Sequence, residues 1–181
     1  MKLTAHAFGS CRIIEDAPVY ELFAAKVRKM FADLQQISHW SNGLGQARVI
    51  ESDVRSIPLD IRVPGLPADL AITSPPYLNN LDYTMQTRLE LFFLDFVKSM
   101  KDLQNLRKRM VISDAKAMYK DVKDHETVQA FDSIRAIMEQ LQERHKDKNW
   151  GWDYAFMTAQ YFGGMYRMLG RVGSLLKPGS R

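Results

Sequence analysis

The sequence predicts an α/β protein in which parallel strands alternate with helices. Two short apolar runs, residues 47–51 and 69–73, have the length of buried strands. Longer segments on either side of these runs repeat apolar residues every three or four positions, which is typical of a helix with one buried face. Because parallel neighbours need a crossover between them, this alternation favours a parallel sheet with flanking helices.

The first element is a helix that starts near Pro18. Turn-forming residues at 41–45 end its pattern, and the run at 47–51 follows with β-branched Val49 and Ile50. We interpret this part of the chain as helix, loop and strand. The apolar residues that predict the helix recur at three- and four-residue intervals: Val19, Leu22, Phe23, Val27, Met30, Phe31 and Leu34.

A second strand is expected after an irregular segment. Residues 57–67 hold three prolines and a glycine, which exclude regular structure there. The apolar run 69–73 comes next and suits a buried parallel strand, although periodicity alone leaves a helix open.

The second half of the chain contains segments that look helical or loop-like. Segments 86–100 and 131–141 each place apolar residues on one side, and a charged stretch lies around 107–124. Four glycines weaken the helical character of 156–176. Residues 175–179 are typical of a helix that gives way through a turn to a following strand, so we expect the sequence to be truncated at its C-terminal end.

Composition limits the possible classes of protein. With 181 residues, of which 46% are hydrophobic, we expect one domain over 1–181. The formal charge of +4 fits a nucleic-acid partner but is equally ordinary for other proteins. A single cysteine, Cys11, excludes an internal disulfide, and the four histidines are too scattered for a zinc motif, so we expect no metal site. No run approaches ~18 apolar residues, and we expect a soluble cytoplasmic protein without a membrane segment.

The residues with the clearest chemistry are Thr73, Ser74, Pro75, Pro76 and Tyr77, placed directly after the predicted second strand. Open α/β sheets bind their ligands at this carboxyl edge. Two consecutive prolines remove two backbone donors and fix two φ angles. The result is a rigid arch that presents carbonyl oxygens, a hydroxyl and an aromatic face. We call residues 73–77 the arch.

This set of groups suits a planar base that carries an amino group. The Ser74 hydroxyl and the Pro75 carbonyl can accept the two amino hydrogens, while the Tyr77 ring stacks on the base. Accepting those hydrogens directs the nitrogen lone pair toward a methyl donor, and no covalent intermediate is needed. The alternative is that the arch is only a strand-terminating turn.

The arch and its continuation resemble the amino-methyltransferases of DNA. Their signature is Asp, Asn or Ser before Pro-Pro-Tyr, and the serine form with a preceding threonine looks most like the cytosine-N4 members. The similarity continues through TSPPYLNNLDYTMQTRLELFFLDF, residues 73–96. It covers the chain from about Ile13 to Gly179 and implies a Rossmann-like methyltransferase domain, incomplete at both ends.

The resemblance also implies a site for S-adenosylmethionine. Glu15 is similar to the carboxylate that accepts hydrogen bonds from both ribose hydroxyls, and Asp53 to the acid that receives the adenine amino group. Each carboxylate taken alone is equally a helix cap or a loop acid. The catalytic residues are then Ser74, with Pro75, Pro76 and Tyr77, and the cofactor-binding residues are Glu15 and Asp53.

The chain departs from that family at one place. The glycine-rich loop that approaches the methionine part of the cofactor is expected some 20 residues before Glu15, but only fourteen residues precede it. Either an N-terminal segment is missing, the loop comes from elsewhere, or the protein binds the cofactor poorly.

The sequence therefore favours methyl transfer to an exocyclic amino group of a DNA base, cytosine N4 before adenine N6. RNA or a protein glutamine is an alternative substrate, and a non-catalytic remnant that binds nucleic acid or a partner is an alternative of another class. Arg107, Lys108 and Arg109 are candidate phosphate contacts or a solvated surface. The methylated base, the recognition sequence and the oligomeric state do not follow from the sequence.

Overall fold

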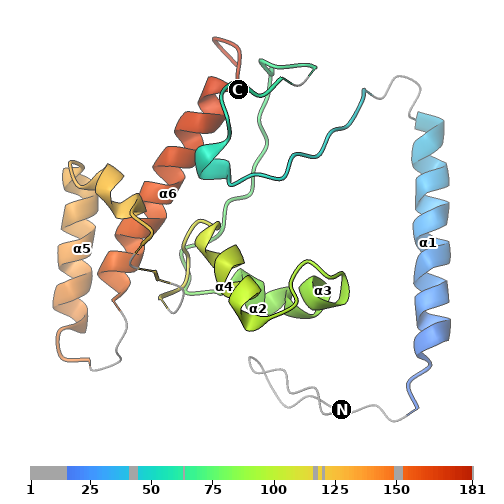
Figure 1. The fold of residues 1–181 in the computed structure, drawn as a ribbon, viewed down its shortest axis with the longest axis horizontal. Helices are drawn as coiled ribbons and strands as arrows, with labels where there is room; N and C mark the ends of the chain where they lie inside the picture. Colours follow the sequence, from blue (N-terminus) through green and yellow to red (C-terminus); the bar gives the residue numbers. More distant parts are fainter. Residues whose placement is uncertain are drawn as a thin grey trace. The chain divides into compact units, whose positions relative to one another are not determined.

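The computed structural model describes residues 16–40, 45–62, 64–115, 118–119, 121–148 and 153–180. The chain divides into two compact units, Met1–Val49 and Ile50–Arg181. The expectation of one domain over 1–181 stays a prediction. The elements of the described residues are α1 (Val19–Trp40), η1 (Val54–Ser56), α2 (Tyr83–Gln86), α3 (Arg88–Phe93), α4 (Met100–Lys108), η3 (Asp124–Val128), α5 (Asp132–His145) and α6 (Tyr154–Ser174), where η denotes a 3₁₀-helix (Figure 1).

The helix of the first unit, α1, confirms the prediction from its apolar periodicity. It runs over 22 residues, longer than the apolar repeat that predicted it. Glu21 in its first turn and His39 in its last turn lie at the ends that the helix dipole favours for an acid and a base. Its apolar side chains are exposed within this unit.

The predicted Rossmann-like sheet is wrong: the described residues contain helices and no strand (Figure 1). The runs at 47–51 and 69–73 lie in irregular backbone, with Val49 exposed at 99% and Ile72 at 88%. A strand persists only where a neighbouring backbone satisfies its polar groups, and these runs have no such neighbour among the described residues. Their apolar, β-branched composition was therefore insufficient to make a sheet.

The nearest approach to strand pairing is a single parallel bridge between Ala68 and Leu176. The Ala68 N–H donates to the Leu175 carbonyl at 2.7 Å, and the Lys177 N–H donates to the Ala68 carbonyl at 2.9 Å. This bridge ties the residues that precede the arch to the end of α6.

The buried side of α6 forms the centre of the second unit. The segment 156–176, left open between helix and loop, is helical up to Ser174, and its glycines do not interrupt the helix. Another buried segment, 111–115, packs against it, and its residues 111–114 have no regular structure. The Asn80 Oδ1 holds this segment by accepting from the Ala115 N–H at 2.8 Å. Ile112, Ala115 and Met157 make one buried apolar cluster there.

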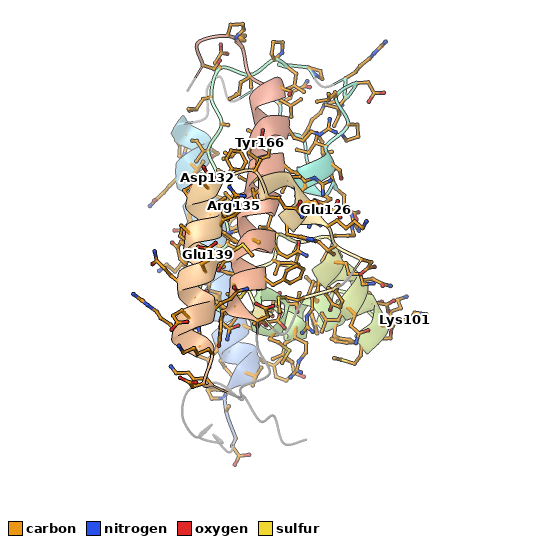
Figure 2. All side chains as sticks on the ribbon, turned by 90° about the vertical axis from the view of Figure 1, so that its left-hand side faces the viewer. Lys101, Glu126, Asp132, Arg135, Glu139 and Tyr166 are labelled. Atoms are coloured by element: carbon orange, nitrogen blue, oxygen red, sulfur yellow. The ribbon has the colours of Figure 1, made fainter. Side chains whose placement is uncertain are left out.

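Helix α5 confirms the helical face predicted over 131–141, and the structure places it beside α6. The rings of Phe131 and Tyr166 approach with centroids 5.5 Å apart. Figure 2 shows Tyr166 next to the start of α5, where Asp132 and Arg135 form an exposed ion pair. The segment 86–100, left open between helix and loop, contains the end of α2, the short α3, an irregular turn and the first residue of α4.

None of the described helices combines the length and the apolar character that a membrane span requires.

Candidate functional site

The arch lines a hollow of about 560 Å³ in the second unit. Such a volume lies within the range of small-molecule sites. Ser74 and Tyr77 are exposed, with Tyr77 at 68%, while Pro75 and Pro76 are half-buried. The other residues that line the hollow come from four further parts of the chain: Ser52, Val54, Tyr83, Arg109, Met110, Val111 and Met168. The structure thus brings all four predicted catalytic residues together on one concave surface.

Two tyrosine hydroxyls hold the arch in place. The Tyr161 hydroxyl, from α6, donates to the Pro76 carbonyl at 2.9 Å. The Tyr77 N–H donates to the Tyr83 hydroxyl, at the start of α2, at 3.0 Å. These bonds engage the Pro76 carbonyl and the Tyr77 N–H, and we call Tyr161 and Tyr83 the tyrosine clamp.

The Tyr161 hydroxyl of the clamp is protonated at neutral pH. Burial raises the pKa of the Tyr161 hydroxyl above its ordinary value, and the neighbouring Tyr83 adds to the same direction. A protonated hydroxyl can donate, as the bond to Pro76 requires. The clamp therefore keeps its hydrogen bond throughout the physiological range.

The polar groups that the clamp leaves open include those predicted to contact a base. Among the described residues, no hydrogen bond involves the Ser74 hydroxyl or the Pro75 carbonyl. Both groups can therefore accept hydrogen bonds from a ligand without first losing a bond to the described part of the protein. Together with the exposed ring of Tyr77, they offer two acceptors and a stacking surface.

Asp53 lies next to this hollow but is already paired. Its neighbours Ser52 and Val54 line the hollow, while its own carboxylate caps η1 by accepting from the Arg55 N–H at 2.9 Å. The same carboxylate accepts from Arg55 Nε at 3.0 Å and from Arg55 Nη2 at 2.7 Å. Burial raises the pKa of Asp53, but the hydrogen bonds and charge of Arg55 outweigh burial and hold it below its usual value. Its role as an adenine acceptor stays a prediction.

Arg55 continues into a buried charge cluster that the sequence analysis missed. Arg55 Nη1 donates to the fully buried carboxylate of Asp124 at 2.5 Å, and Arg167 from α6 donates to the other oxygen at 2.6 Å. A carboxylate placed between two guanidinium groups is paired as a buried charge must be. Burial lowers the pKa of Arg55, but Asp53 and Asp124 outweigh it and raise the pKa.

Two glycines of α6 make room for this cluster. A Cβ added at Gly163 would lie 1.9 Å from the Asp124 carbonyl oxygen, and one at Gly164 would lie 3.3 Å from its carboxylate. Two of the four glycines that the sequence suggested as a weakness of this helix, Gly163 and Gly164, therefore allow η3 to pack closely against it.

The basic run 107–109 is divided among acidic partners. Arg107 pairs with Asp82 and donates to the Thr84 hydroxyl at 2.7 Å, and Lys108 pairs with Asp121. Arg109 lines the hollow, is half-exposed, and makes an exposed pair with Glu51 at 3.2 Å. Of the three cations, only Arg109 is placed where a bound nucleotide could reach it.

The other predicted cofactor ligand, Glu15, lies outside the described residues. Among the residues that were missed, Tyr83 stands inside the stretch that carries the resemblance. Tyr161 lies three residues after the buried Thr158, on the same face of α6. This spacing could have indicated that Tyr161 faces the interior of the protein. Asp124 and Arg167 carried no local signal because their meeting depends on the tertiary fold.

The described residues contain no group of three or more His, Cys, Asp or Glu side chains arranged to hold a metal ion. No protein-family model, curated protein or solved structure matches the chain.

Proposed function

We propose that the protein transfers a methyl group from S-adenosylmethionine to an exocyclic amino group of a DNA base, cytosine N4 in preference to adenine N6. One observation carries the proposal. The arch lines a hollow of about 560 Å³ with the acceptors of Ser74 and Pro75 uncommitted and the Tyr77 ring exposed.

The division of hydrogen bonds within the arch supports a base with an amino group. The Pro76 carbonyl and the Tyr77 N–H are engaged by the tyrosine clamp. The Ser74 hydroxyl and the Pro75 carbonyl, which lie beside the Tyr77 ring in the chain, remain available, and both can accept a hydrogen bond. An amino group on the base supplies two N–H donors for the two acceptors. A carbonyl group on the base would instead place its oxygen against the Pro75 carbonyl oxygen, and neither could donate.

The chemistry follows from that binding mode. Hydrogen bonds from the amino group to Ser74 and Pro75 hold the nitrogen lone pair toward the methyl group. The nitrogen–carbon bond forms as the sulfur–carbon bond of the methyl donor breaks, and the excess amino proton leaves to water. Proximity and alignment supply most of the acceleration in such a direct displacement.

A second candidate function is base binding without methyl transfer. The pairing of Asp53 favours it, because a carboxylate that accepts three donors of Arg55 has little capacity left for an adenine amino group. Cofactor binding at Asp53 would require Arg55 to give up part of that pairing.

Methyl incorporation from labelled S-adenosylmethionine into duplex DNA, transfer RNA and a protein fraction tests the substrate. We expect label in DNA, lost in Ser74→Ala and retained in Ser133→Ala, an exposed serine of α5. Label only in RNA or protein would make DNA the wrong substrate.

Calorimetric titration with S-adenosylmethionine separates the two functions. Heat of binding that saturates is expected for the methyltransferase. No heat at millimolar cofactor, combined with measurable DNA binding, would leave base binding as the function.

A further inference from the structure

The apolar side of α1 contains a heptad seam. Alternate spacings of three and four residues relate its members, and these spacings are typical of positions that face a partner helix in a coiled coil. All six are exposed within the first unit, Phe23 at 68% and Leu34 at 63%. The seam consists of Tyr20, Phe23, Val27, Met30, Leu34 and Ile37.

The residues that flank the seam carry opposite charges on the same side. Lys26 and Asp33 are one heptad apart, directly before Val27 and Leu34. They are too distant along the helix to pair with each other, since neighbours on a helix surface are three or four residues apart. Within the described part of this unit, neither takes part in an ion pair. Lys26 and Asp33 therefore have no ion-pair partner in the described part of this unit, and each has the charge that the other would bind.

We propose that α1 pairs antiparallel with α1 of a second copy of this chain. A two-fold axis near the middle of the helix places Val27 opposite Met30 of the other copy. The same axis places Phe23 opposite Leu34, and Tyr20 opposite Ile37. An isologous interface of this kind requires the surface to complement itself, residue i meeting j and j meeting i.

The flanks satisfy that requirement in the antiparallel arrangement. Lys26 falls between the same two apolar layers as Asp33 of the other copy, so the axis generates this opposite-charge pair twice. On the other flank, Ala24 falls opposite Phe31, and a small residue leaves room for the ring. A parallel pair would place Lys26 beside Phe31 and Asp33 beside Ser38, without any charge pair.

Sedimentation of the full chain over a range of concentrations tests the pairing. We expect a reversible dimer. Lys26→Asp should raise the dimer dissociation constant about tenfold, because two Asp–Asp contacts replace two opposite-charge pairs. The double variant Lys26→Asp, Asp33→Lys should restore the original constant. Both positions are exposed, and far-ultraviolet circular dichroism will show that α1 is retained.

Disulfide trapping tests the orientation, in a Cys11→Ser background. Phe23→Cys and Leu34→Cys chains, mixed under mild oxidation, should form the mixed disulfide in preference to either homodisulfide. Preferential 23–23 linkage would overturn the antiparallel arrangement. A chain that stays monomeric while the α1 amides are protected from hydrogen exchange would overturn the pairing itself, since the seam would then be covered within one chain.

Discussion

Helix α6 supports two regions of the second unit in opposite ways. On one side, Gly163, Gly164 and Arg167 meet η3, where the fully buried Asp124 carboxylate pairs with Arg167 and with the buried Arg55. On another, Tyr161 reaches the arch and fixes its Pro76 carbonyl, while Ser74 and Tyr77 stay open to solvent. The charge cluster is closed and internally paired, and the arch is uncharged and only partly paired.

The difference shows that polar groups in the charge cluster stabilise the fold, whereas polar groups in the arch are left available for a ligand. In the cluster, each acidic oxygen named above already has a guanidinium partner, so a ligand would have to displace one. In the arch, the clamp uses two backbone groups, and the Ser74 hydroxyl and the Pro75 carbonyl keep no partner among the described residues. Strong charge thus marks the scaffold here, and incomplete hydrogen bonding marks the candidate site.

The largest effect is expected from breaking the closed region. Asp124→Ala removes the shared partner of two guanidinium groups and leaves the buried Arg55 with Asp53 as its one remaining carboxylate partner. Unfolding in urea should show a loss of about 3–5 kcal/mol, the cost typical of removing one member of a buried pair. The matched control is Asp121→Ala, whose pair with Lys108 is exposed and worth at most about 1 kcal/mol. Equal losses in both variants would mean that the cluster does not stabilise this unit.

Gly163→Ala tests the same region by crowding it. The added Cβ would lie 1.9 Å from the Asp124 carbonyl, so η3 or α6 must shift. We expect a loss of about 1–3 kcal/mol or more in urea unfolding, as for other overpacked sites.

The matched control for that substitution is Gly170→Ala in the same helix, where nothing lies within 4 Å of the added Cβ. Alanine is the better helix former, so this variant should gain up to about 1 kcal/mol. Equal behaviour of the two variants would contradict the close approach of η3 to α6.

The open region should respond in binding and not in stability. Tyr77→Ala is expected to weaken binding of a cytosine-containing single-stranded oligonucleotide by about 1–3 kcal/mol, the usual worth of one stacked base. The free energy of unfolding should hardly change, because the ring is 68% exposed. Fluorescence anisotropy measures the affinity, with Phe93→Ala, exposed at 89% and outside the hollow, as the control. Unchanged affinity in Tyr77→Ala would remove the stacking role.

Local patterns in the sequence predicted the helices better than the sheet. Apolar repeats predicted α1 and α5. A helix closes its backbone hydrogen bonds within four residues, so it needs no distant partner to form them. The runs 47–51 and 69–73 required partner strands that no local pattern can supply, and Val49 and Ile72 are exposed instead.

The same distinction applies to the candidate site. Residues 74–77 are contiguous, and the structure gathers them around one hollow as a consequence of the chain itself. The assignment of Asp53 to the cofactor did not consider its pairing with Arg55. An arginine two residues after a candidate capping aspartate could have suggested that pair from the sequence. Tyr161 contacts Pro76 across 85 positions, a separation that the resemblance did not address.

The smallest effect, and the one that bears on both regions, concerns the clamp. Tyr161→Phe keeps the ring on α6 and removes only the donor to Pro76, so the loss of stability should be about 0.5–1.5 kcal/mol, as for one ordinary hydrogen bond.

Because the pKa of this hydroxyl is raised in the folded protein, its contribution to the free energy of unfolding is complete below the ordinary tyrosine pKa of about 10. It is lost as the pH rises through the higher folded value. Urea unfolding from pH 8 to pH 11 should therefore show a constant gap between wild type and variant that narrows only above about pH 10. Tyr166→Phe, which changes an exposed tyrosine of the same helix, should show a gap within about 0.5 kcal/mol at every pH. A Tyr161→Phe gap that disappears below pH 9 would contradict the raised pKa, and oligonucleotide affinity unchanged in that variant would separate the clamp from the ligand site.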